Sequence, residues 1–236
     1  MTPHFAQLPA RLDYVDAVYK ALLDAITDGS LAPGLRITQE QIAEQMNVSR
    51  SPVLQALRLL KKDGLVQDAP GRGVQVTPLS VDWIAKVYEV RGVLDGLAAR
   101  LAAERGARLD PGLLADGLRA SEGTDIKALI DADLAFHTAI YEASGNALIH
   151  ESAYLHWVHL RRVMGAVLQV SAQRRHIWDE HQAIADAIHA RDGALAARLA
   201  ERHSSNARAN VVERLGRVLE SPPQSSPPLP LLDAVV

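Results

Sequence analysis

The sequence predicts a mainly α-helical protein with an N-terminal winged helix-turn-helix and a C-terminal, all-α antiparallel bundle of six or seven helices. Ala, Leu and Arg dominate the 236 residues, and aromatic residues make up only 4%, which favours helices over an aromatic-rich β-sandwich. Short alternating segments and turn residues lie before Pro78, whereas long helical patterns follow it. A chain of this length more often folds as two small domains than as one large domain.

The composition excludes several classes of protein. A hydrophobic fraction of 48% can build a buried core, so wholesale disorder is excluded. The chain contains no Cys, which removes disulfide scaffolds, thiolate zinc sites and Cys nucleophiles. No apolar run approaches the roughly 20 residues that cross a bilayer, and the first residues lack a secretory signal pattern. We therefore expect a cytoplasmic protein without a membrane partner.

The N-terminal part begins with two predicted helices. The amphipathic pattern of residues 14–27 ends at Gly29, a natural helix stop. A turn and a very short strand follow within residues 31–37. Thr38 then stands three residues before Gln41, which is the spacing of a capping box and predicts the start of the second helix.

A third helix and a hairpin complete this unit. The helix opens at Ser51-Pro52, because Pro in a first turn sacrifices no hydrogen bond, and it continues to Gly64. Two short alternating segments, 65–68 and 73–77, are joined by turn residues and predict a hairpin. The order helix, helix, short turn, helix, hairpin is that of a winged helix-turn-helix.

The remainder of the chain up to Leu219 has helical patterns separated by Gly, Pro and Asn breaks. We expect helices over residues 81–105, 111–121, 125–143, 147–170, 174–190 and 193–219, with a weak break near Ser171. Four segments result: an N-terminal arm (1–13), the winged unit (14–78), the helical domain (79–219) and a Pro-rich tail (220–236) without a helical period.

The third helix has the residues of a recognition helix, the helix that lies in the major groove with its first residues at base edges. Ser49 and Ser51 are short donors suited to phosphates, and Arg50 can pair bidentately with guanine. In the hairpin, Arg72 lies between two glycines, which lets the backbone approach DNA closely. We assign DNA contacts to Thr38, Ser49, Arg50, Ser51, Arg58, Arg72 and Gly73.

Charge is distributed unevenly along the chain. The formal net charge is −3 and argues mildly against a nucleic-acid partner. However, residues 47–76 contain more basic than acidic side chains, namely Arg50, Arg58, Lys61, Lys62 and Arg72 against Asp63 and Asp68. The alternative is that these are solvated charges on a small helical domain, but the topology and the glycine-flanked Arg72 favour DNA.

Residues 14–78 resemble the winged helix-turn-helix of the GntR family of bacterial transcription regulators. The matching residues are Ile42-Ala43-Glu44-Gln45-Met46-Asn47-Val48-Ser49-Arg50-Ser51-Pro52-Val53, Ala56-Leu57, Leu60, Asp63-Gly64-Leu65-Val66 and Gly71-Arg72-Gly73. The family usually has an Arg-Glu pair after Pro-Val, whereas this chain has Leu54-Gln55. The resemblance implies binding to an operator through Arg50 and Arg72, without the Arg that commonly helps to contact DNA in the family and so without a basis for assigning the family's usual operator preference.

Polar residues interrupt the apolar stripes of three C-terminal helices. Asp133 and His137 are four residues apart and therefore share one face of the predicted helix 125–143. His181 and His203 lie on the stripes of the last two helices. Polar groups on inward faces are the informative ones, because a buried polar group needs a partner.

Antiparallel geometry can bring these four residues together. His181 and His203 are equally far from the turn at Asp192-Gly193, so they reach the same level of a helical hairpin. Three imidazoles and a carboxylate suit a divalent metal: zinc first, with nickel and manganese as alternatives. Taken singly, each histidine could instead be a hydrogen-bonded core residue.

Residues 81–215 resemble the FCD effector domain of the same family. The matching motifs are Arg91 with an acid four residues later (Asp95, where Glu is usual), Asp133 with His137, Ser144-Gly145-Asn146, Glu180-His181 and His203. The resemblance implies that Asp133 and the three histidines bind a metal, which helps to hold a small organic-acid effector.

Arg91 is the candidate for binding the effector carboxylate, because a guanidinium offers paired N–H hydrogen-bond donors. An ion pair with Glu89 or Asp95 is an equal alternative for Arg91. Arg161 and Arg162 are instead interpreted as a solvated face.

The resulting hypothesis is a DNA-binding transcription regulator, by default a repressor, that is not an enzyme. It would bind an inverted repeat as a homodimer and respond to a small carboxylate metabolite. Two alternatives remain open at this point. The first is a metal-dependent enzyme that uses the three-His, one-Asp site to activate water, and the second is a regulator for which the metal itself is the signal.

Overall fold

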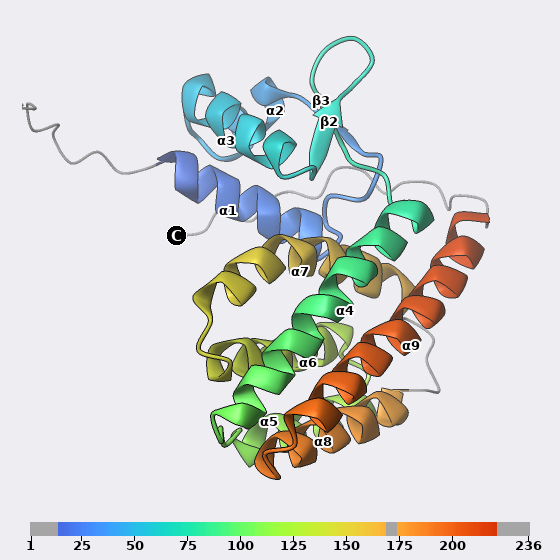
Figure 1. The fold of residues 1–236 in the computed structure, drawn as a ribbon. Coiled ribbons are helices and arrows are strands. Elements are labelled where there is room, and N and C mark those ends of the chain that lie inside the picture. The colour runs from blue at the N-terminus through green and yellow to red at the C-terminus, as the bar shows by residue number, and fades with distance from the viewer. Residues whose placement is uncertain (1–13, 169–173, 221–236) are drawn as a thin grey trace, which may run out of the picture. The chain divides into compact units, whose positions relative to one another are not determined.

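The computed structural model describes residues 14–168 and 174–220, which form nine helices and one three-stranded sheet (Figure 1). The described residues divide into two compact units, one of residues 14–26 and 31–77 and the other of residues 27–30 and 78–220. The mainly α fold class, with a winged unit followed by a helical one, is confirmed. The expected arm, the tail beyond Glu220 and the weak break near Ser171 lie outside the described residues.

The first unit has its helices and strands in the expected order. Its elements are α1 (Tyr14–Thr27), β1 (Arg36–Ile37), α2 (Gln39–Gln45), α3 (Arg50–Lys62), β2 (Val66–Asp68) and β3 (Val74–Val76). The capping box is present: the Thr38 side chain accepts from the Gln41 amide, and the Gln41 side chain accepts from the Thr38 amide. Leu22 of α1, Ile42 of α2 and Leu60 of α3 are all buried and contribute to the core of this unit.

The wing is an antiparallel sheet in the order β1-β3-β2. Gly71 and Gly73 have φ values of +87° and +93°, a region in which residues other than glycine are strained. A β-carbon at Gly73 would also lie 2.5 Å from the carbonyl oxygen of Ile37. Glycine at position 73 therefore lets the hairpin lie close against β1.

The second unit contains six helices within the described ranges. They are α4 (Val81–Glu104), α5 (Pro111–Glu122), α6 (Ile126–Ala143), α7 (Ala147–Val167), α8 (Arg174–His189) and α9 (Gly193–Glu220). The long helices α4 and α9 run side by side in opposite directions (Figure 1). Gly92 and Gly96 of α4 face Ser204 and Glu201 of α9, and their lack of side chains permits this close approach.

The bundle core combines large apolar side chains with a buried polar centre. Phe136, Trp178, Ile184 and Leu160 are almost completely buried. Among them lie ten buried polar or charged residues: Arg91, Asp95, Asp133, His137, Ser144, His159, Arg162, His181, His203 and Ser204. Ionisable groups this deep require mutual compensation. No helix in the described ranges is long and apolar enough to cross a membrane.

Candidate metal centre and DNA-binding face

Three helices bring the four predicted metal ligands together. Asp133 and His137 lie one turn apart on α6, His181 lies on α8 and His203 on α9. One potential ligand atom from each residue lies within 4.8 Å of all the others. All four side chains are buried. The helical hairpin places His181 and His203 at the same level, with 3.2 Å between their Nε2 atoms.

The hydrogen bonds around the quartet direct ring nitrogens toward its centre. The carboxylate of Glu180 accepts from Nδ1 of His203 at 2.8 Å, which leaves Nε2 of His203 facing the other ligands. Arginine only donates, so Nε2 of His137 accepts from Nη2 of Arg91 at 2.8 Å, and a metal bound at this nitrogen would replace that hydrogen bond. His181 differs, because its buried Nδ1 has no hydrogen-bond partner. Its ring is held by stacking on Phe136 instead.

The donor set and its spacing fit a divalent ion. Ligand atoms about 2.1 Å from a tetrahedral zinc ion lie about 3.4 Å from one another. Nε2 of His181 lies 3.4 Å from Oδ1 of Asp133 and 3.2 Å from Nε2 of His203. The distance from Nε2 of His137 to Oδ1 of Asp133 is longer, at 4.0 Å. The carboxylate on His203 is a partner typical of a metal-ligating histidine.

Burial also sets the protonation of these residues. Desolvation and the nearby Arg91 charge hold the pKa of His137 well below its usual value. Desolvation and the neighbouring His203 do the same for the pKa of His181. Both imidazoles are therefore neutral at pH 7, the form that binds metals. Desolvation raises the pKa of Asp133, although Arg91 and His203 oppose this shift.

Arg91 is buried and paired with Asp95, as one of the two interpretations of its role anticipated. Its Nε lies 3.1 Å from Oδ2 of Asp95, and both side chains are 2% exposed. The guanidinium also lies 4.2 Å from the centre of the Trp157 ring. Burial by itself lowers the pKa of Arg91, but the combined charges of Asp95, Tyr141, Tyr88 and Asp133 outweigh burial and raise the pKa, so Arg91 is a permanent cation.

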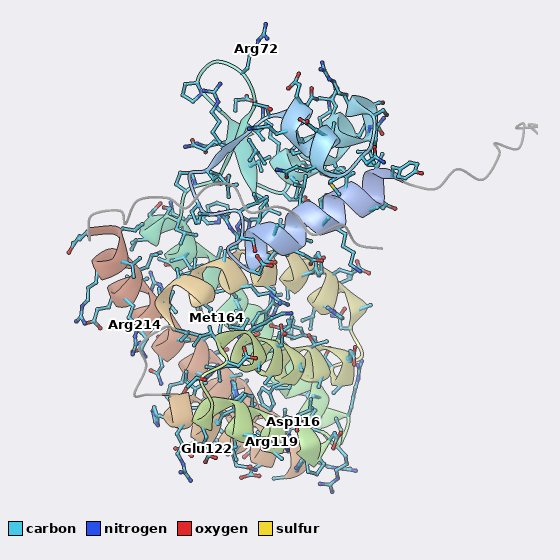
Figure 2. All side chains as sticks on the ribbon, turned by 180° about the vertical axis from the view of Figure 1, so that it is seen from behind. Arg72, Asp116, Arg119, Glu122, Met164 and Arg214 are labelled. Carbon is cyan, nitrogen blue, oxygen red and sulfur yellow. The ribbon has the colours of Figure 1, made fainter. Side chains whose placement is uncertain are left out.

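A small cavity of about 80 Å³ adjoins the quartet. Arg91, Asp133 and His203 form a polar part of its wall, and α7, α8 and α9 supply apolar residues. Met164 and Arg214, which are marked in Figure 2, line it as well. A volume of this size exceeds that of a single water several-fold. The cavity therefore places a fixed cation, apolar side chains and two of the four predicted metal ligands, Asp133 and His203, around one space.

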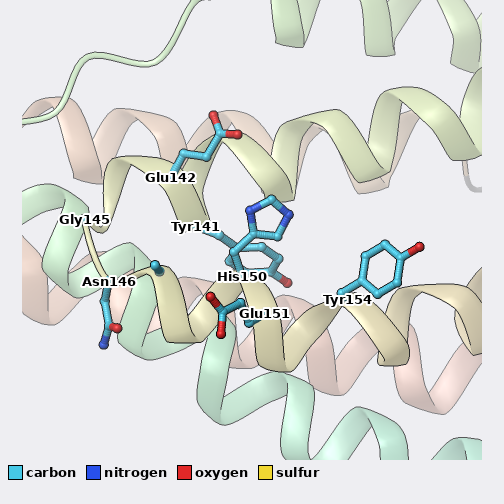
Figure 3. A pocket seen from close by; sticks show the side chains of 8 residues that line it. Tyr141, Glu142, Gly145, Asn146, His150, Glu151 and Tyr154 are labelled. Carbon is cyan, nitrogen blue, oxygen red and sulfur yellow. The ribbon is translucent and has the colours of Figure 1, made fainter. Parts of the chain in front are cut away.

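A second hollow lies open to solvent over the turn between α6 and α7 (Figure 3). Its lining residues are Tyr141, Glu142, Gly145, Asn146, Ala147, His150, Glu151 and Tyr154. Tyr141 connects this hollow to the interior, because its hydroxyl donates to Asp95 at 2.5 Å. The four predicted metal ligands are not among its lining residues.

The interpretation of Arg161 and Arg162 as a solvated face is wrong for Arg162. Arg162 is 6% exposed, and burial lowers its pKa to about 10. Arg161 pairs with Asp131 at 2.7 Å and is partly exposed. Successive residues of a helix point about 100° apart, so one can face the core while the other faces water. The sequence alone does not show which of the two neighbouring arginines is buried.

The residues assigned to DNA contacts are on the surface of the first unit. Ser49, which precedes α3, and Arg50, Ser51 and Arg58 of α3 are exposed, and Arg50 pairs with Glu40 of α2 at 3.3 Å. Arg72 lies at the tip of the hairpin and points outward (Figure 2). Thr38 is half-buried at the start of α2, where it caps the helix.

Sequence patterns missed two groups of supporting residues. The guanidinium of Arg36 on β1 donates to the carbonyl oxygen of Arg72, with Nε at 2.8 Å, and so braces the wing tip. In the bundle, Tyr141 and Ser204 donate to Asp95. Tyr141 continues the helical spacing of Asp133 and His137, and Ser204 follows His203, but neither residue type signals a site alone.

Two family models match consecutive parts of the chain. Residues 15–76 match the family described as bacterial regulatory proteins, gntR family. Residues 86–206 match the FCD domain. The HTH-type transcriptional regulator LutR of Bacillus subtilis (strain 168) is 30% identical over 211 residues, covering 77% of this chain and 93% of LutR. The regulator YdhC of the same organism is 29% identical over 157 residues, covering 62% of this chain and 70% of YdhC.

Solved structures have the same fold. The E. coli protein McbR/YncC superposes with a TM-score of 0.73 at 22% identity, covering 87% of this chain and 100% of that protein. A transcriptional regulator GntR from Rhodococcus sp. RHA1 has a TM-score of 0.70 at 25% identity, covering 86% of this chain and 99% of that protein. The family matches and the named relatives are those of transcription regulators, which favours a regulator over the metalloenzyme alternative. The chain is a DNA-binding transcription regulator of the GntR family with an FCD domain, and not an enzyme.

Proposed function

We propose that the FCD domain holds a divalent metal and a small organic acid, and that the acid modulates operator binding by the winged unit. The convergence of Asp133, His137, His181 and His203 beside a cavity that contains Arg91 carries this proposal. Zinc suits the donor set best, with nickel and manganese as alternatives. A metal bound there would supply positive charge and an open coordination position for a carboxylate oxygen.

Different residues of the chain would bind the metal, orient its ligands and bind the acid. Asp133 and the three histidines hold the ion, and Glu180 orients His203 by accepting from its Nδ1. Arg91 contributes a second positive charge and planar donors suited to a carboxylate. The apolar residues that α7, α8 and α9 contribute to the cavity wall lower the local polarity, which would strengthen these electrostatic interactions.

We assign DNA recognition to α3 and the wing. Arg50 reads a guanine, Arg72 reaches the minor groove or a phosphate, and the small polar residues at the start of α3 bind phosphates. A cytoplasmic homodimer places two winged units on an inverted repeat, since one unit alone has limited affinity. The acid changes operator affinity through its different affinities for the two states of the dimer. Relief of repression is the expected sign.

A gel-shift assay on the protein's own promoter region tests the proposal. The protein is compared with and without a chelator and small acids, and native mass spectrometry reports its metal content. We expect bound metal, and operator binding that acids weaken only in the metal-loaded protein. Full operator binding that acids never change would overturn effector modulation. Operator affinity that follows the metal concentration alone would instead establish a metal-sensing regulator.

A further inference from the structure

Asp95 lies at the centre of a buried polar network that connects four helices. Its carboxylate accepts from Tyr141 of α6 at 2.5 Å and from Ser204 of α9 at 2.7 Å. Its Oδ2 lies 3.1 Å from Nε of Arg91, one turn earlier on α4. Trp157 of α7 donates to the hydroxyl of Tyr141 at 3.2 Å. A carboxylate with three such partners has a fixed position.

This network sets the orientation of the Arg91 guanidinium. Asp95 lies on its Nε side, the Trp157 ring covers it, and Nη2 reaches His137. The Nε contact is an ion pair without the alignment of a hydrogen bond, so charge attraction holds the group there. A long side chain such as Arg otherwise has many rotamers, and fixing it in advance lowers the entropic cost of binding an anion.

We propose that Asp95 is a positioning residue that sets the carboxylate affinity of the FCD domain by holding Arg91 toward the cavity. Tyr141 and Ser204 support Asp95 in this role. Ser204 directly follows the predicted ligand His203 on α9, so the same carboxylate joins the acid-binding Arg91 to the helix that carries a metal ligand. The inference rests on the proposed function, since it explains the strength of the acid binding proposed above.

The test compares variants of the full chain loaded with cobalt, whose absorption spectrum reports the ligand geometry. Acetate, lactate and succinate are titrated by calorimetry into wild type, Asp95→Asn, Asp95→Glu and Ser204→Ala. Asp95→Asn should weaken acid binding about 10-fold to 100-fold, the range for loss of a charge-assisted contact. Asp95→Glu should recover part of this loss, and Ser204→Ala should lose a smaller factor. The cobalt spectrum before acid addition should not change.

Ser144→Ala is the matched control for Ser204→Ala. Ser144 is equally buried and donates to the carbonyl oxygen of Tyr141, but it does not contact Asp95. It should lower thermal stability without changing acid affinity. Asp95→Asn also removes the counter-charge of a buried cation, so a lower melting temperature is expected for it as well.

A double-mutant cycle separates positioning from general damage. In an Arg91→Lys background the oriented guanidinium is already absent, so adding Asp95→Asn should change acid affinity by less than twofold. An equal loss in both backgrounds, or wild-type affinity in Asp95→Asn alone, would overturn the role of Asp95. If the cobalt-loaded wild type binds none of the three acids, the proposed effector function itself fails. These outcomes are therefore distinguishable.

Discussion

At the scale of single residues, the candidate centre depends on groups that are costly to bury alone. His181 is completely buried and lacks a partner at Nδ1, yet it lies against both Asp133 and His203. A ligand at Nε2, which faces Asp133 and His203, would add an interaction to this buried ring but would leave Nδ1 without a partner. The residue's packing against Phe136 and Trp178 keeps it in place without a second hydrogen bond.

His181→Ala should reduce the metal content of the purified protein and abolish the response to acids. Operator binding without acid should remain measurable, because the winged unit has its own core. Metal analysis and gel shifts measure the two effects. Gln182→Ala on the same helix is the control, since Gln182 is exposed, donates to Asp186 and should not affect metal content. Full metal occupancy in His181→Ala would show that the quartet is misassigned.

Arg50→Ala should weaken binding to the specific operator by about 1–3 kcal/mol, the range for a bidentate contact to guanine. The exposed ion pair with Glu40 contributes little to folding, so the melting temperature should stay close to that of wild type. Fluorescence anisotropy on specific and random duplexes measures the change. An equal loss on both duplexes would assign Arg50 to phosphate contact and not to base recognition.

At the scale of elements, the wing depends on one close backbone contact. The hairpin lies against β1 because Gly73 has no side chain, and Arg36 holds the turn through the Arg72 carbonyl. From the sequence, Gly71 and Gly73 are expected to let the backbone approach DNA closely. The structure adds an internal reason for Gly73, since any β-carbon would collide with Ile37.

Gly73→Ala should displace the wing tip and weaken operator binding about 10-fold or more, because a β-carbon 2.5 Å from the Ile37 oxygen forces the hairpin away. Gly71→Ala is the matched control. It has a similar positive φ, but its β-carbon would meet only the flexible Arg36 side chain at 3.4 Å. It should therefore add only about 1 kcal/mol of backbone strain. Equal operator affinities for the two variants would contradict this role of Gly73.

At the scale of the whole molecule, the buried histidines make the stability of the metal-free protein dependent on pH. The pKa values of His137 and His181 lie below the unfolded value of about 6.5. Below pH 6.5 the unfolded chain therefore binds protons that the folded protein does not, and stability falls as the pH is lowered. Asp133 acts in the opposite direction, because its raised pKa favours the folded state at acid pH.

Each such histidine should contribute about 1.4 kcal/mol per pH unit between pH 6.5 and its folded pKa. We expect His181→Asn to reduce the slope of unfolding free energy against pH by that amount, as measured by urea denaturation of the chelator-treated protein. Gln182→Ala, at an exposed position on the same helix, is the control and should keep the wild-type slope. A slope that is unchanged in His181→Asn would contradict a neutral, buried His181.

Much of the architecture follows from the sequence because its signals are local. The capping spacing of Thr38 and Gln41, the glycine stops and the Asp-Pro and Asp-Gly breaks depend on neighbouring residues alone. Most expected helix boundaries therefore agree with the structure within about three residues. Even the meeting of His181 and His203 is predictable, since equal distances from one turn fix the level of both residues in an antiparallel hairpin.

Local patterns cannot show which charged side chain is buried or what holds it. The sequence by itself determined the two-part fold, the exposed polar and basic residues at the start of α3 and which four residues form the quartet. Only the tertiary structure decided that Asp95 pairs with Arg91 and receives Ser204 from a helix more than 100 residues away. It likewise showed that Arg162 is buried while its neighbour Arg161 is not. The physical reason is that burial and long-range pairing depend on how whole helices pack, which no short segment encodes.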